Sequence, residues 1–204
     1  MQPTLDPDIL RQWIGKTEST SDMLQQGSVN LMEMTLDRAP VLREGDVLPP
    51  LWHWLYFLQS AQLSALGRDG HPARGGFLPP VALPRRMWAG SRFGFNHALS
   101  IGAQAQKQSR ITDVALKTGS TGALCFVTVR HEVGTADSAA FWEEHDIVYR
   151  EDPTPNAPRR ETPLVGTDWQ HSETIHPSEV MLFRYSALTF NGHRIHYDRD
   201  YARD

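Results

Sequence analysis

Hydrophobic residues recur at helical spacing near the start of the chain. An apolar stripe made by Ile9–Leu10 and Trp13–Ile14 predicts a helix that Asp6–Pro7 can begin. Apolar residues recur again over residues 23–36, and the polar run Ser19–Asp22 offers several N-caps in front of them. We therefore expect a second helix there.

The middle of the chain alternates between dense apolar runs and stretches rich in Gly and Pro. Leu51–Leu58 is short, apolar and aromatic, which favours a buried strand. Residues 38–50 and 67–84 contain many turn-forming residues and are expected to be loops. Four strand-like segments follow, with a glycine-containing turn between the second and third: residues 86–95, 109–117, 123–133 and 141–150.

The order of these elements, helices first and an antiparallel meander afterwards, indicates an α+β fold. The proline-rich residues 151–169 are expected to form a linker. Ser178 can cap a helix from Glu179 to about Phe190, and Asp198 can cap the start of another. The chain thus divides into a larger first unit and the beginning of a second one.

Composition narrows the class of protein. The 204 residues carry 20 Lys and Arg against 24 Asp and Glu, a net charge of −4, which disfavours nucleic acid as the main partner. The single Cys125 excludes a disulfide framework and a multi-cysteine zinc site, and it is expected to be a buried, inert thiol. No apolar run approaches the length of a membrane helix, and no signal or transit pattern is present. A cytoplasmic enzyme or a cytoplasmic binding protein for a small ligand is the expectation.

Most of the candidate chemistry lies in residues 182–198, where polar and titratable side chains surround a glycine-containing turn. Asn191 and His196 are five positions apart across this turn, and histidine is the usual general base near pH 7. Two other readings stay open. His196 can be a packed core residue beside an Arg194–Asp198 capping pair, or His193, His196 and Asp198 can be metal ligands.

This stretch resembles the hydratase motif of the MaoC-like, double hot-dog acyl-thioester dehydratases. The branch most similar includes mesaconyl-C4-CoA/itaconyl-CoA hydratases and the mitochondrial 3-hydroxyacyl-thioester dehydratase. The resemblance covers nearly the whole chain from about Trp13. Besides the motif it rests on four further segments of the first unit: residues 48–57, 75–80, 84–90 and 144–150.

The resemblance implies a hot-dog fold and a hydro-lyase that interconverts enoyl and 3-hydroxyacyl thioesters. His196 would be the base that activates water, and Asn191, where the broader family has Asp, would orient the water or the imidazole. The substrate would be an acyl-CoA or an acyl-carrier thioester, with no cofactor and no metal. The residues expected to bind it are Arg85, Arg86, Trp88, Tyr185 and Arg194.

The resemblance also implies a domain plan. Residues 1–150 would be a non-catalytic N-terminal hot dog, 151–174 a linker and 175–204 the beginning of a catalytic hot dog. Since the family continues with a glycine-containing helix and further strands, the 204 residues as written are expected to lack a complete active site. A homodimer would protect the exposed sheet edge.

Two other functions remain open at this point. A non-catalytic module that binds acyl thioesters would use the first hot dog alone. A hot-dog thioesterase would need a carboxylate near the thioester, but Asp22 and Glu33 are expected to be solvated. The Asp69–Pro72 segment is interpreted as a turn and not as a site.

Overall fold

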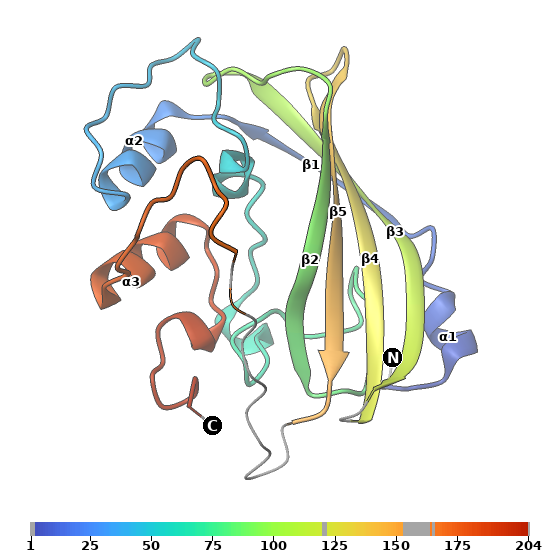
Figure 1. Cartoon of the computed structure of the whole chain (residues 1–204). Helices are drawn as coiled ribbons and strands as arrows, with labels where there is room; N and C mark the ends of the chain where they lie inside the picture. Colours follow the sequence, from blue (N-terminus) through green and yellow to red (C-terminus); the bar gives the residue numbers. More distant parts are fainter. Residues whose placement is uncertain (1–2, 120–121, 153–163, 165, 204) are drawn as a thin grey trace.

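The computed structural model describes residues 3–119, 122–152, 164 and 166–203. Five strands form one sheet, and short helices lie around it (Figure 1). In chain order the elements are α1 (Pro7–Arg11), β1 (Thr17–Met23), α2 (Gln26–Thr35), η1 (Trp52–Leu55), η2 (Leu63–Ala65), β2 (Arg85–Phe95), β3 (Gln104–Gly119), β4 (Gly122–Gly134), β5 (Ala139–Arg150), α3 (Glu179–Leu188) and η3 (Arg194–His196).

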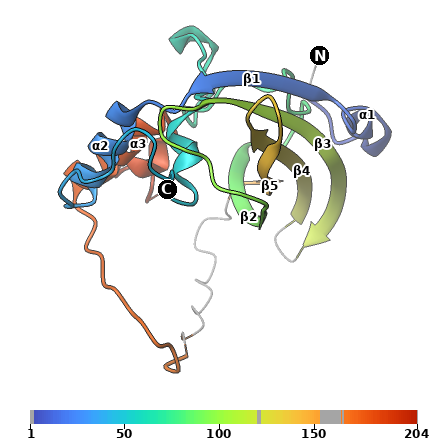
Figure 2. The same cartoon turned by 90° about the horizontal axis from the view of Figure 1, so that it is seen from above.

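The sheet is antiparallel throughout, with strand order β1-β3-β4-β5-β2. β3, β4 and β5 form the expected meander, while β2 joins β5 at one end and β1 joins β3 at the other. Seen from above, the strands follow an arc with β1 and β2 at its ends (Figure 2). The predicted α+β class and the four predicted strands are confirmed, although β3 begins five residues earlier than expected.

The second predicted helix is partly wrong. Ser19–Asp22 does not cap it but belongs to β1, which pairs with residues 104–110 of β3. These small polar residues suit an edge strand, because most of its side chains are exposed. α2 begins later, at Gln26, and no side chain caps it.

Leu51–Leu58 is buried in part, as expected, but it is not a strand. Leu51 and Phe57 have φ values of 70° and 54°, and a 3-10 turn lies between them. A left-handed residue at each end is incompatible with an extended chain. The Asp22 carboxylate accepts a hydrogen bond of 2.9 Å from the Phe57 N–H, so this residue, expected to be solvated, fixes the turn instead.

Glu33 is also not the solvated residue that was expected. It is 3% exposed on α2, and one of its carboxylate oxygens accepts hydrogen bonds from the N–H groups of Val41 and Leu42 at 3.1 and 3.4 Å. The side chain therefore anchors the predicted loop that follows α2.

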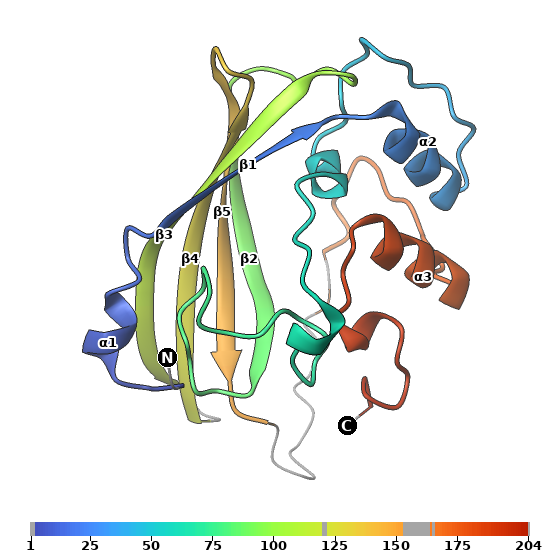
Figure 3. The same ribbon diagram turned by 180° about the vertical axis from the view of Figure 1, so that it is seen from behind.

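One face of the sheet carries the core. Directly opposed residues of neighbouring strands point to the same face, so Val129 of β4, Ile111 of β3 and His145 of β5 share it. Two apolar clusters form on this face. The first packs against α2 and η1, and the second packs against α1 and the loop before β2. α1 lies beside β3, whereas α2 and α3 lie together on the other side of the molecule (Figure 3).

The C-terminal helix is as predicted. The Ser178 hydroxyl accepts a hydrogen bond from the Met181 N–H and caps α3. Residues 153–163 and 165 of the predicted linker lie outside the described residues, and the three predicted domain boundaries stay predictions. No helix in the described part of the chain has the length and apolar composition to span a bilayer.

Candidate active site

The turn after α3 holds the two predicted catalytic residues. Ser186 and Asn191 tie its ends together, because the Asn191 N–H donates to the Ser186 carbonyl and the Ser186 hydroxyl donates to the Asn191 carbonyl. The Asn191 side-chain oxygen accepts a hydrogen bond of 3.1 Å from the His193 N–H. His196 follows in η3 and is half-buried. Asn191 thus shapes the turn that presents the two histidines.

A second turn, residues 67–72, lies directly against this one. The Arg194 N–H donates to the Asp69 carbonyl at 2.9 Å, and its guanidinium donates to the Arg68 carbonyl at 3.2 Å. Gly70, with φ at 84°, approaches Gly192 so closely that a Cβ at Gly70 would lie 2.0 Å from the Gly192 carbonyl oxygen. The two turns come from segments more than 100 residues apart, yet their backbones touch.

Three histidines and one carboxylate gather where the turns meet. We call this set, Asp69, His71, His193 and His196, the histidine cluster. The Asp69 carboxylate lies 3.0 Å from His71 Nδ1. The His71 and His193 ring centroids are 4.2 Å apart, and those of His193 and His196 are 5.6 Å apart.

The surroundings of His193 and His196 favour the neutral form of these two imidazoles. Burial, reinforced by the charge of His71, lowers the pKa of His193 to about 4. Burial and His71 also lower the pKa of His196. For Asp69, burial opposes ionisation, but hydrogen bonds from His71 keep its pKa well below the ordinary value. At pH 7 His196 is therefore unprotonated and able to accept a proton.

The cluster also bears on the metal alternative. The alternative set of His193, His196 and Asp198 is not assembled as a metal site, because Asp198 is ion-paired with Arg194 at 2.7 Å. Within the described residues, the group with metal-ligating atoms close together is Asp69, His71 and His193, within 4.8 Å of one another. The Asp69–His71 hydrogen bond and the ring contact already account for this proximity.

The five predicted substrate-binding residues do not lie together in one site. Arg86 lies on the core face, directly opposite Tyr149, whereas Arg85 lies on the other face, opposite Arg150. Arg194 adjoins the histidine cluster but is engaged by Asp198. The two aromatic candidates are not part of the cluster: Trp88 on β2 is 62% exposed and Tyr185 on α3 is 41% exposed.

A second polar group lies on the core face and had no signal in the sequence. Glu143 of β5 is 2% exposed and accepts hydrogen bonds from His53, Trp54 and Ser91 at 3.3, 3.2 and 2.8 Å. These donors lower the pKa of Glu143 even though burial opposes ionisation. Its donors come from η1 and β2, so only the folded chain brings them together.

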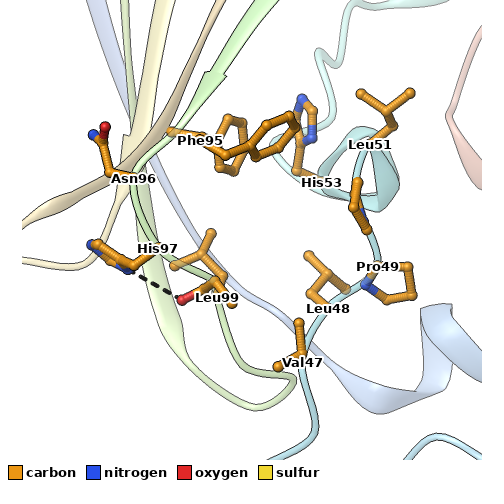
Figure 4. A pocket seen from close by; sticks show the side chains of 12 residues that line it. Val47, Leu48, Pro49, Leu51, His53, Phe95, Asn96, His97 and Leu99 are labelled. Atoms are coloured by element: carbon orange, nitrogen blue, oxygen red, sulfur yellow. Dashed lines mark hydrogen bonds between the residues drawn. The ribbon is translucent and has the colours of Figure 1, made fainter.

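His53 also lines an apolar pocket of about 320 Å³ between η1 and the end of β2 (Figure 4). Neither Asn191 nor His196 lines it. The buried Cys125 is elsewhere in the core, where burial raises its pKa to about 11, as expected of an inert thiol. The lining residues of the pocket are Val47–Leu51, His53, Phe95–Leu99 and Phe141.

The fold and the turn motif define the class of hot-dog acyl-thioester hydratases and dehydratases, and similarity to known proteins agrees. A family model described as hydroxyacyl-thioester dehydratase type 2 matches residues 51–204. The chain is 44% identical over 192 residues to the mesaconyl-C(4)-CoA hydratase of Chloroflexus aurantiacus, covering 94% of this chain and 69% of that protein. It is 25% identical over 182 residues to the mitochondrial hydroxyacyl-thioester dehydratase type 2 of Schizosaccharomyces pombe, covering 76% of this chain and 59% of that protein.

Solved structures show the same fold. A MaoC-like dehydratase matches with a TM-score of 0.62 and 11% identity, over 95% of this chain and 71% of that one. HtdX of Mycobacterium tuberculosis matches with a TM-score of 0.55 and 16% identity, over 92% of this chain and 66% of that one. The chain belongs to the hydroxyacyl-thioester dehydratase type 2 family. The hot-dog fold and the hydratase/dehydratase class predicted from the sequence are thereby confirmed.

Proposed function

We propose that this chain hydrates the double bond of an enoyl thioester, or removes water from the 3-hydroxyacyl thioester, with His196 as the base. In the forward direction His196 takes a proton from water while the water oxygen adds to the β-carbon. The proton then goes to the α-carbon, so that atoms and charge balance. The reaction consumes no cofactor.

One observation carries this assignment. His196 is an unprotonated, half-buried imidazole that adjoins the turn held by Asn191, on a chain of the hydroxyacyl-thioester dehydratase type 2 family. With its oxygen engaged by the His193 N–H, the Asn191 amide still has its nitrogen to donate to a water or to the substrate. An amide cannot take a proton, so the proton transfers fall to the imidazole.

We further propose a CoA thioester as substrate, and mesaconyl-C4-CoA as the first to test, because the Chloroflexus relative carries that name. A homodimer and a cytoplasmic location are part of the same proposal. Strand β2 ends the sheet beside β5, and pairing of this edge with a second copy would satisfy its free backbone groups. Light scattering on a gel-filtration column tests the dimer.

The test of activity is the loss of enoyl absorbance with crotonyl-CoA and mesaconyl-C4-CoA, with the His196→Ala variant as the control. Wild-type turnover that the variant loses supports the proposal. If the thioesters raise the melting temperature but none is turned over, the chain is a binding module and the proposal is wrong.

A further inference from the structure

Four arginines surround the histidine cluster, and three of them are occupied. Arg68 is paired with Asp152. Arg194 is paired with Asp198. Arg74 donates to the backbone carbonyls of the loop before β2. Arg86 makes no ion pair with any of the described residues, and its guanidinium lies within hydrogen-bonding reach of the Tyr149 hydroxyl. A half-buried guanidinium that no carboxylate of the described residues neutralises is suited to an anion from outside.

Arg86 is held at the border of the cluster by the sheet. It stands opposite Tyr149, so both side chains lie on the core face of the sheet. Its charge adds to the effects that lower the pKa of Asp69 and of His193, which places the guanidinium near both turns.

Tyr149 supplies a second donor beside Arg86. The side chain is fully buried, and its hydroxyl lies beside the Arg86 guanidinium but has no acceptor for its own proton among the described residues. Burial raises the pKa of Tyr149, so the phenol keeps its proton at pH 7. Buried polar groups are rarely left unpaired, and a cation next to an unused O–H is a combination that favours a carboxylate.

The chemistry of the reaction limits which anion can reach this place. The phosphates of CoA are separated from the thioester by the long pantetheine arm, so a residue that borders the base is badly placed for them. A carboxylate bonded directly to the double bond is different, because it lies one bond from the reacting carbons. Whatever binds that carboxylate must lie close to the base, and Arg86 acts on Asp69 and His193 of the histidine cluster to which the base belongs.

We propose that Arg86, together with the Tyr149 hydroxyl, binds the free carboxylate of an unsaturated dicarboxylic acid monothioester and so selects the substrate. This inference rests on the proposed function, because it concerns the same site. It narrows the expectation that Arg86 binds the substrate to one contact, and it predicts that neutral enoyl thioesters are poorer substrates than carboxylated ones.

The experiment compares two substrates and three variants of the full chain. Mesaconyl-C4-CoA carries the carboxylate, and crotonyl-CoA lacks it. Arg86→Gln removes the charge, and Arg86→Lys keeps the charge without the planar fork. Arg92→Gln is the matched control, because Arg92 lies on the same strand but faces outward in ion pairs with Glu144 and Asp146.

We expect Arg86→Gln to lower kcat/KM for mesaconyl-C4-CoA about 100-fold and that for crotonyl-CoA less than about threefold. Arg86→Lys should recover part of the loss, and Arg92→Gln should leave both values unchanged. An equal loss on both substrates, or no loss on either, overturns the proposal. Melting temperatures of all variants separate loss of fold from loss of selection.

A binding measurement tests the carboxylate site at Arg86 separately from the proposed hydratase activity. Methylsuccinyl-CoA with a free carboxylate and butyryl-CoA are saturated and cannot be hydrated. If wild-type protein turns over neither enoyl substrate, the proposed function fails, yet calorimetry with these two ligands still tests Arg86. Tighter binding of the carboxylated ligand that Arg86→Gln abolishes supports the carboxylate site, and equal binding of both ligands refutes it.

Discussion

The contact between Gly70 and Gly192 predicts a large effect from a single methyl group. In Gly70→Ala the new Cβ would lie 2.0 Å from the Gly192 carbonyl oxygen, and the left-handed φ of 84° adds strain of its own. The strain alone costs about 1–2 kcal/mol. To restore a normal contact, the two turns must separate by about 1 Å, a displacement that can lower the rate of an enzyme about 100-fold.

Gly45→Ala is the matched control. Gly45 has a φ of 92°, but a Cβ there would meet nothing within 4 Å. Both variants therefore carry the same backbone strain, and only Gly70→Ala pushes the two turns apart. For a chain of this size, 1–2 kcal/mol corresponds to a fall in Tm of about 2–8 °C.

Hydratase assays and thermal melts on both variants test this. We expect both to lose stability, but only Gly70→Ala to lose about two orders of magnitude in kcat/KM. If Gly70→Ala keeps wild-type activity within about threefold, the contact between the turns does not position the catalytic residues, and our description of the active site is wrong.

Three further predictions address the proton chemistry and the buried carboxylate. His196→Ala should lower kcat at least about 100-fold with little change in Tm, and an active His196→Ala would contradict this. Asn191→Asp should keep activity, because one carboxylate oxygen can accept the same hydrogen bond from the His193 N–H and the other can accept one from the water that the amide nitrogen would otherwise bind. Because the pKa of His193 falls from 6.5 to about 4 on folding, the unfolded chain takes up the proton first as the pH is lowered. The free energy of unfolding should therefore decrease by about 2–3 kcal/mol between pH 6.5 and 4. Urea midpoints across that range should show a shallower decrease in His193→Gln, and identical slopes would refute it. Glu143→Ala should cost about 3 kcal/mol or more in urea unfolding, because three donors, among them the buried His53, lose their acceptor. Glu144→Ala on the outer face should cost less than about 1 kcal/mol, and equal costs would be inconsistent with a buried network around Glu143.

The strands of the meander could be predicted because each is specified by the pattern of residues within the strand itself. Residues 123–133 alternate in burial with period two, and that pattern needs no knowledge of the rest of the chain. The role of Ser178 as the N-cap of α3 could be predicted for the same reason, since a cap and its helix are adjacent in sequence. The segment from Leu51 to Leu58 was misjudged because its aromatic residues are buried in a turn, and composition alone does not distinguish a buried turn from a buried strand.

The site could be predicted only in part, for the same reason. Asn191 and His196 belong to one short motif, so the sequence displays them together. Asp69 and His71 were interpreted as turn residues, and the hydrogen bond of 3.1 Å from the His71 N–H to the Asp69 carboxylate confirms that turn. Their second role depends on a contact with His193, which no local pattern encodes.

The strand order has a consequence for the kinetics of folding. β3, β4 and β5 follow one another in the chain, so their pairing closes short loops, whereas β1 can join β3 only after a far longer segment has been brought back. Closing a long loop costs more chain entropy and slows the formation of such contacts. The meander should therefore be structured in the folding transition state, with high φ-values at positions such as Val127, and β1 should join last. Substitutions in β1 would then accelerate unfolding and leave the folding rate almost unchanged.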